Sequence, residues 1–256
     1  MTARRRTAFT LLEILVVMGV IGVLLGILVP SLTRARSVAK RAACSSNLRH
    51  VGIAVHCYAQ QFNGSIPYGP KAPPALTAGN FYPATGTPTS LISLLNGEPV
   101  GAGLLLDDYL SNTPQALFCP ATDQPVDTGA ELEKVGRSQA QASYYYRHAS
   151  VARRFDPAGG VPRPEHVRLD DLGRNRKGKP MRVLALDTQF DVSSEFAAFG
   201  VVPRTHHGRR GVNTLYSDGS VGWHANENER FTVRLDTVQS LINPFDAILS
   251  TFEAAE

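Results

Sequence analysis

An uninterrupted apolar segment near the amino terminus constrains the fold more than any other feature. Residues 14–29 are all apolar or glycine, and three consecutive arginines occupy positions 4–6. With its flanking residues, a helix over this segment spans about 30 Å, the thickness of the hydrocarbon core of a bilayer. No polar face is left for contact with water, so a membrane span is favoured over a helix in a soluble core.

One carboxylate, Glu13, lies at the start of this apolar segment. A carboxylate in hydrocarbon needs a partner, because an unpaired one costs at least several kcal/mol. A cleaved secretory signal, with residues 37–39 as its cleavage site, does not explain the acid, and neither does a simple signal anchor. A carboxylate that reaches the lipid headgroups is a further alternative.

The string Ala8-Phe9-Thr10-Leu11-Leu12-Glu13 resembles the processing motif of type IV prepilins, the precursors of pilins and of type II secretion pseudopilins. The resemblance implies cleavage by prepilin peptidase between Ala8 and Phe9, followed by methylation of the new amino terminus at Phe9. It also implies assembly roles for Glu13 and Pro30. Glu13 would pair with the amino group of Phe9 on a neighbouring subunit.

The same resemblance implies a structural function rather than an enzymatic one. The chain would be a subunit of a type II secretion pseudopilus or a type IV pilus-like filament, with related subunits and the inner-membrane assembly machinery as partners. It would cross the inner membrane once, with a cytoplasmic amino terminus and a periplasmic head. A minor pilin or a membrane-anchored surface-binding module, using loops at 64–100 and 156–180, is the alternative function.

The chain divides into four predicted parts. Residues 1–8 form a cleaved leader, residues 9–32 a transmembrane helix, and residues 33–63 an amphipathic continuation of that helix. The continuation carries apolar residues at helical spacing, namely Leu48, Val51, Val55, Tyr58 and Phe62, and Asn63-Gly64 is typical of a helix end. Residues 64–256 form an α+β, pilin-like head in which the helix packs on a mainly antiparallel sheet.

Several elements are expected within the head. A short helix is predicted near 104–110, a short buried strand within 113–123, and a strand within 138–150 whose tyrosines 144–146 alternate in burial. Residues 181–190 have the β-propensity of one strand. Asp218-Gly219 predicts a hairpin with a type I′ turn between arms at 211–216 and 220–223. The tail at 231–245 is expected to add a strand or a short helix.

The three cysteines cannot all pair within one chain. Cys44 and Cys57 lie on the same predicted helix about 20 Å apart, and a disulfide requires Cα atoms closer than about 7 Å. Two pairings stay open, Cys44–Cys119 and Cys57–Cys119.

Residues 204–219 resemble the carboxy-terminal module of a bacterial prepilin subfamily, in which nine residues separate a His from Asp-Gly. Ten residues separate His207 from Asp218-Gly219 here, and His206 lies one residue farther away. With Asp187, these side chains are the candidates for a metal or catalytic site, and a membrane-anchored enzyme is the hypothesis that uses them. A turn-shaping Asp and loop-capping histidines are favoured instead, so no cofactor or metal is predicted. Calcium is the one ion kept as a possibility, although no dense run of oxygen ligands supports it.

The charge balance and the absence of two motifs argue against three classes of function. The net charge is +4, but without the leader arginines the basic and acidic residues are almost equal in number. Nucleic-acid binding driven by charge is therefore not expected. No Gly-x-Ser-x-Gly elbow and no glycine-rich phosphate loop occurs in the sequence.

Overall fold

The computed structural model describes residues 11–67, 89–94, 96–147, 167–174, 178–187, 189–193 and 203–235. The chain forms two compact units, residues 1–40 and 41–256. The predicted cleavage site at Ala8 and Phe9 and most of the two predicted surface loops lie outside the described residues. Within the first of these loops, 64–100, the prediction is wrong at residues 89–93, which form a strand with buried Leu91 and Ile92.

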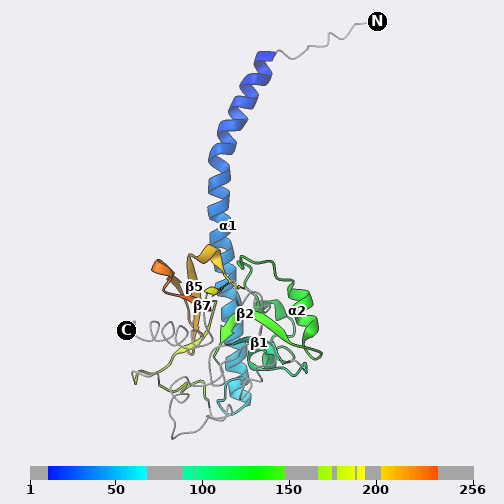
Figure 1. Cartoon of the computed structure of the whole chain (residues 1–256), viewed down its shortest axis with the longest axis vertical. Coiled ribbons are helices and arrows are strands. Elements are labelled where there is room, and N and C mark those ends of the chain that lie inside the picture. The colour runs from blue at the N-terminus through cyan, green and yellow to red at the C-terminus, as the bar shows by residue number, and fades with distance from the viewer. Residues whose placement is uncertain are drawn as a thin grey trace. The chain divides into compact units, whose positions relative to one another are not determined.

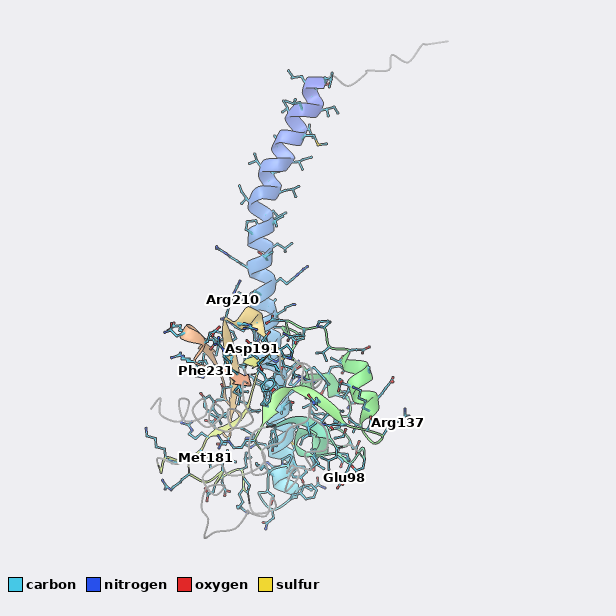
Figure 2. The ribbon with its side chains drawn as sticks, viewed as in Figure 1. Glu98, Arg137, Met181, Asp191, Arg210 and Phe231 are labelled. Carbon is cyan, nitrogen blue, oxygen red and sulfur yellow. A yellow bond between two sulfur atoms is a disulfide. The ribbon has the colours of Figure 1, made fainter. Side chains whose placement is uncertain are left out.

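The first unit contributes the start of helix α1 (Leu11–Gln61), drawn in blue in Figure 1. Its large apolar side chains are exposed, from 44% at Ile21 to 90% at Leu11. They extend from all sides of the helix (Figure 2). Pro30 lies inside the helix, and the hydroxyl of Thr33 donates to the Pro30 carbonyl at 2.9 Å. This part of α1 therefore has no apolar cover within its own unit.

In the second unit, the rest of α1 buries the predicted apolar stripe. Leu48, Val51, Val55 and Tyr58 are at most 5% exposed. Phe62 was expected in the same stripe but is 47% exposed, because α1 has already ended at Gln61; its ring stacks on Tyr58 instead. The predicted helix end is confirmed by left-handed backbone at residues 63 and 64, where φ is 52° and 84°.

A five-stranded antiparallel sheet forms the centre of the second unit, in the order β1-β2-β3-β5-β6. Its strands are β1 (Thr89–Ser93), β2 (Ala140–Tyr146), β3 (Val183–Leu186), β5 (Gly211–Tyr216) and β6 (Val221–Ala225). A separate parallel pair joins β4 (Gln189–Val192) to β7 (Thr232–Leu235), so the tail adds a strand as expected. The predicted α+β fold, a long helix with an antiparallel sheet, is confirmed.

A glycine allows α1 to approach the sheet closely. A Cβ atom at Gly52 would lie 2.9 Å from a methyl group of Leu215 in β5 and 3.8 Å from the Cα atom of Gly219. Two polar contacts add to this packing: the Asn47 amide donates to the Phe118 carbonyl at 2.9 Å, and the Tyr144 hydroxyl to the Cys44 carbonyl at 3.4 Å. Residues 41–61 thus supply one wall of the core.

The β5–β6 hairpin is confirmed, but its turn is not type I′. Tyr216 pairs with Ser220, so the loop contains three residues, and of these only Gly219 has positive φ, at 83°. A type I′ turn would require positive φ at Asp218 as well. The three-residue loop with a left-handed glycine is the next most common hairpin geometry.

The strand predicted within 113–123 is wrong. The structure has a short 3-10 helix, η3 (Pro114–Leu117), followed by a single bridge between Thr122 and His206. Proline at the first helical position favours a helical turn because its φ is already fixed near the helical value. The helix expected near 104–110 is a 3-10 helix a few residues earlier, η2 (Gly101–Leu105).

One further helix, α2 (Thr128–Lys134), was not expected from the sequence. The side chain of Asp127 caps it by accepting a hydrogen bond from the Ala130 amide at 3.0 Å. An Asp before a short charged segment is a typical cap, but seven residues are too few for a strong periodic signal.

The three tyrosines of β2 do not alternate in burial. Tyr144, Tyr145 and Tyr146 are all at most 8% exposed, because β2 lies inside the sheet and both of its faces are covered. Tyr144 contacts α1, whereas the ring of Tyr145 lies 6.2 Å from that of Phe190. Burial raises the pKa of all three phenols, that of Tyr145 to about 12.

The single strand expected at 181–190 is two strands, β3 and β4. The chain leaves the central sheet at Asp187, and β4 then pairs with β7. This break places a carboxylate at the end of β3, inside the core.

Candidate site: a buried disulfide, histidine and aspartate

A disulfide joins α1 to the segment after η3. Cys44 lies on α1 and Cys119 two residues after Leu117, with their Cα atoms 5.2 Å apart. Of the two pairings that the sequence left open, the structure contains Cys44–Cys119, and Cys57 is free and exposed. Both bonded cysteines are at most 2% exposed, so the bond lies in the core.

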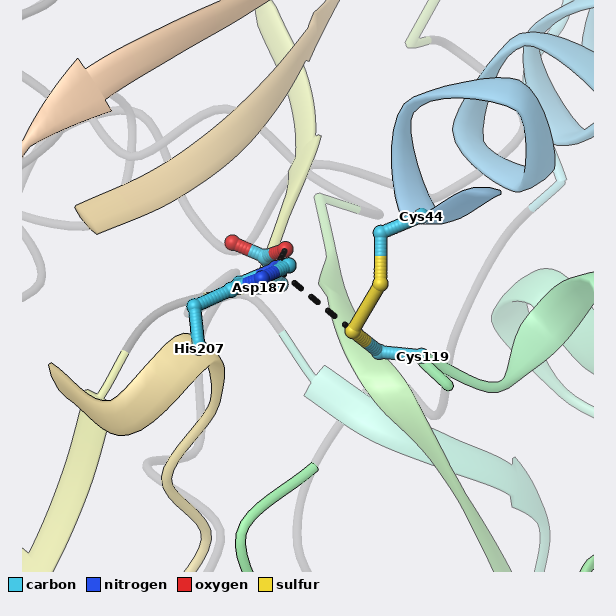
Figure 3. A group of neighbouring side chains, drawn as sticks. All are labelled: Cys44, Cys119, Asp187 and His207. Carbon is cyan, nitrogen blue, oxygen red and sulfur yellow. Dashed lines mark hydrogen bonds and ion pairs between the residues drawn. A yellow bond between two sulfur atoms is a disulfide. The ribbon is translucent and has the colours of Figure 1, made fainter. Parts of the chain in front are cut away.

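The ring of His207 points at this disulfide (Figure 3). Its Nε2 atom lies 3.6 Å from the Sγ atom of Cys119 and 2.9 Å from a carboxylate oxygen of Asp187. His207 starts the short 3-10 helix η6 (His207–Arg209) with φ at 56°, and its amide donates to the Ala121 carbonyl at 2.7 Å. A left-handed backbone is unfavourable for histidine, so the surrounding contacts must hold it.

Asp187 is fully buried and is held by Asn213 of β5. The Asn213 backbone amide donates to Oδ1 at 2.5 Å, and its side-chain amide donates to Oδ2 at 2.8 Å. The Asp187 amide in turn donates to the Asn213 carbonyl at 3.2 Å. The carboxylate therefore has one fixed orientation, with Oδ2 toward His207 (Figure 3).

His206, the neighbour of His207, is also buried but has a different environment. Neither ring nitrogen has a hydrogen-bond partner among the described residues. Burial lowers the pKa of its imidazole from 6.5 to about 4, and the nearby Asp187 carboxylate opposes this shift only partly. The ring is therefore neutral at pH 7 and acts as a core side chain.

Polar side chains fix the backbone segments around the cluster formed by Cys44, Cys119, Asp187 and His207. The His206 amide donates to the Gln189 side chain at 2.8 Å, and that side chain donates to the Gly211 carbonyl at 3.1 Å. On the other side, the Thr205 hydroxyl donates to Asp123 at 2.8 Å. These bonds fix the backbone on both sides of His207 to β4, β5 and the segment after Cys119.

The predicted pair of His207 with Asp218-Gly219 is not brought together by these contacts. Asp218 accepts hydrogen bonds from the amide and hydroxyl of Ser220, at 2.9 and 2.6 Å, and from Arg182 at 3.2 Å. The bonds from Ser220, more than the Arg182 guanidinium, lower the pKa of the Asp218 carboxyl. Asp218 shapes the hairpin turn, and Asp187 occupies the place beside His207.

Gly219 has a packing role against α1. A Cβ atom there would lie 3.7 Å from the Nε2 atom of His56. With the contact of Gly52, this places the Asp-Gly turn on the helix surface. The Asp218-Gly219 turn therefore packs the β5–β6 hairpin against α1.

The amino-terminal candidates lie in the first unit. Glu13 is exposed and occupies the first turn of α1, and Pro30 lies farther along the same helix. Within the described residues, α1 is the one helix that is long and apolar enough to cross a membrane.

Comparison with known proteins finds a family match for the start of the chain alone. Residues 3–29 match the family described as the prokaryotic N-terminal methylation motif. No curated protein and no solved structure matches the chain. The likeness of residues 204–219 to a prepilin subfamily stays a prediction. Residues 3–29 are thus a prepilin-type amino-terminal segment, the segment that marks type IV pilin- and pseudopilin-like precursors.

Proposed function

We propose that this protein is a pilin-like structural subunit. Prepilin peptidase cuts it between Ala8 and Phe9, Phe9 is methylated, and the mature subunit assembles into a type II secretion pseudopilus or a type IV pilus-like filament. The observation that carries this proposal is the first part of α1, which lies within the methylation-motif match up to residue 29 and is apolar and exposed on every side.

Such a helix requires a non-aqueous environment. Burying one Val, Leu, Ile or Met side chain contributes about 1.5–3 kcal/mol, and more than a dozen such side chains are exposed between residues 11 and 29. Lipid can cover them before assembly, and the helices of neighbouring subunits can cover them afterwards. A filament with a core of packed helices would bury the same apolar surface that first anchors the subunit in the membrane.

Leader removal has an electrostatic reason. The three arginines at positions 4–6 would resist burial of the helix end among other helices, because a charge in an apolar environment is costly. Cleavage removes them and leaves an α-amino group at Phe9. Glu13 of an adjacent subunit can pair with that group only when the two subunits are in register.

The head supports a structural role in an oxidising compartment. Its disulfide is of the kind that persists in exported proteins, which agrees with a periplasmic head on an inner-membrane anchor. The Asp187–His207 pair is buried, with side-chain exposures of 0% and 4%, and so it is closed to a substrate. These residues are better suited to holding the head together than to catalysis.

Mass spectrometry of the mature amino terminus tests the proposal. The full chain is expressed with and without a prepilin peptidase, and membranes are collected. We expect a chain that starts at methylated Phe9 only when the peptidase is present. A chain that keeps its first eight residues in both samples, and that never cross-links to copies of itself, contradicts the proposal.

A further inference from the structure

Four side chains with metal-binding atoms converge at the buried disulfide. The Sγ atoms of Cys44 and Cys119, a carboxylate oxygen of Asp187 and a ring nitrogen of His207 all lie within 4.8 Å of one another. They come from α1, the segment after η3, the end of β3 and the start of η6 (Figure 3). The geometry points to a second state of this site, in which the disulfide is reduced and the four side chains bind one Zn²⁺ ion.

The donor set selects zinc among common metals. Two thiolates, one imidazole and one carboxylate are the ligand types of tetrahedral Zn²⁺, whereas Ca²⁺ and Mg²⁺ take oxygen ligands almost entirely. The sequence led us to expect no metal, with calcium as the remaining possibility, and the two cysteines, 75 residues apart in the chain, were considered only as disulfide partners.

The existing distances are close to those of a zinc tetrahedron. With Zn–N and Zn–S bonds of about 2.0–2.1 and 2.3 Å, the nitrogen and a sulfur would be about 3.6 Å apart. The Nε2 atom of His207 and the Sγ atom of Cys119 are 3.6 Å apart in the disulfide state. The contact between Nε2 and Asp187, 2.9 Å, would need to lengthen by only about 0.4 Å. The main changes are separation of the two sulfur atoms and loss of the contact between the Asn213 side-chain nitrogen and Nε2, which are now 3.1 Å apart.

The surrounding residues already orient the ligands. Asn213 donates to both oxygens of Asp187, which fixes the carboxylate, and the amide of His207 is bonded to the Ala121 carbonyl. The ring of Trp223 meets the ring of His207 edge-on, with centroids 5.1 Å apart. Outer contacts of this kind typically change metal affinity about 10–100-fold.

The chemistry balances with a dithiol as reductant. The dithiol gives two electrons and two protons to the Cys44–Cys119 bond and becomes a disulfide, while the two cysteines become thiols. Zn²⁺ then replaces the two thiol protons, which are released to solvent. A disulfide oxidant reverses the exchange: it takes two electrons from the zinc-bound thiolates and two protons from solvent, becomes a dithiol, and the Cys44–Cys119 bond re-forms as Zn²⁺ is released. This inference does not depend on filament assembly.

Metal binding by the full chain in detergent tests the inference. The protein is reduced with a phosphine, which does not compete strongly for zinc, and is then given Zn²⁺ or Co²⁺. We expect one bound Zn²⁺ per reduced chain and none per oxidised chain, and thiolate-to-cobalt charge-transfer absorption with Co²⁺. Circular dichroism follows the fold, and Zn²⁺ should restore the melting temperature that reduction lowers.

Variants identify the ligands. The double variant Cys44→Ser, Cys119→Ser should bind Zn²⁺ at least 100-fold more weakly, and His207→Gln at least 10-fold more weakly. Cys57→Ser is the matched control, since Cys57 is free and exposed, and it should bind as the wild type does. The inference is overturned if the reduced chain binds neither ion, if Zn²⁺ does not raise the melting temperature of the reduced chain, or if His207→Gln binds Zn²⁺ with unchanged affinity.

Discussion

Asp187 and Asn213 form three hydrogen bonds with one another where β3 ends beside β5. Two of them, from the backbone and side-chain amides of Asn213, reach the carboxylate oxygens of Asp187 at 2.5 and 2.8 Å. The third joins their backbones. Since Asp187 also contacts His207, this pair connects the central sheet to the disulfide cluster.

Removing the side-chain amide should destabilise the head. We expect Asn213→Ala to lower the free energy of unfolding by about 1.5–3 kcal/mol, because the fully buried carboxyl group of Asp187 loses a hydrogen bond. Urea unfolding of the disulfide-bonded chain in detergent measures the change. Glu133→Ala, an exposed position on α2, is the control and should stay within about 0.5 kcal/mol. Equal stability of the two variants would contradict the assigned role.

Gly103 should tolerate no side chain. A Cβ atom there would lie 1.8 Å from the backbone carbonyl oxygen of Ile92 in β1, which accepts a hydrogen bond from Val100. We expect Gly103→Ala to lower the free energy of unfolding by about 3 kcal/mol or more, since backbone rather than a flexible side chain must move. Gly129→Ala on α2 has room and should change stability by at most about 1 kcal/mol. Thermal unfolding of both variants distinguishes them.

Acid should destabilise the disulfide-bonded head through His206. Its pKa is about 4 in the folded state against an ordinary value of 6.5, so the unfolded chain binds more protons between these values. The full contribution is present above about pH 6.5 and is lost as the pH falls toward 4, a total of about 3 kcal/mol. The groups that influence this ring are Asp187, Asp123, His207 and Arg204.

Unfolding free energies between pH 7 and pH 4 measure this effect. His206→Phe removes the titrating group and should flatten the profile, whereas His50→Gln, at an exposed position, should leave it as in the wild type. A profile that is equally steep in the His206 variant would show that other groups cause the loss.

Cleavage should depend on the size of the residue before the cut. We expect Ala8→Leu to block processing by prepilin peptidase, because a bulky side chain would occupy the place of a small one. Ala8→Gly is the matched control and should be cleaved as efficiently as the wild type. Gel mobility and intact mass of membrane samples report both results, and mature protein from Ala8→Leu would show that the cut lies elsewhere.

Assembly, but not cleavage, should depend on Glu13. We expect Glu13→Ala to be processed normally and to reduce the assembled fraction at least about tenfold, since a loss of 1.4 kcal/mol per contact already changes an equilibrium constant tenfold. Met18→Leu, a volume-conserving change on the same helix, should assemble normally. Cross-linking in membranes measures the assembled fraction, and normal assembly of Glu13→Ala would refute the predicted ion pair.

Local signals in the sequence predicted much of the fold. The end of α1 at Asn63-Gly64 and the β5–β6 hairpin depend on residues close together in the chain, and both are present. The segment around Pro114 was misjudged because an apolar run of a few residues fits a strand and a 3-10 turn equally well. Burial of all three tyrosines in β2 depends on which strands flank it, and that information is not local.

The candidate site was only partly predictable for the same reason. The sequence identified His207, Asp187 and the cysteines as candidates. It paired His207 with the nearby Asp218-Gly219, however, whereas in the structure His207 contacts Asp187. Asp187 is 20 residues from His207 in the chain, and Cys119 is 88 residues away. One available signal was the position of Asp187 directly after a buried β-rich run, where a carboxylate must find a partner inside the fold.

The covalent bond between Cys44 and Cys119 also determines how the head responds to mechanical load. Cys44 lies only three residues after the second unit begins at Arg41. A force that pulls on the anchor helix therefore reaches a covalent crosslink before it reaches most of the helix–sheet packing. Such a force is transmitted through the disulfide to Cys119, 75 residues farther along the chain. Peeling the helix away from the sheet would then require rupture or reduction of the sulfur–sulfur bond.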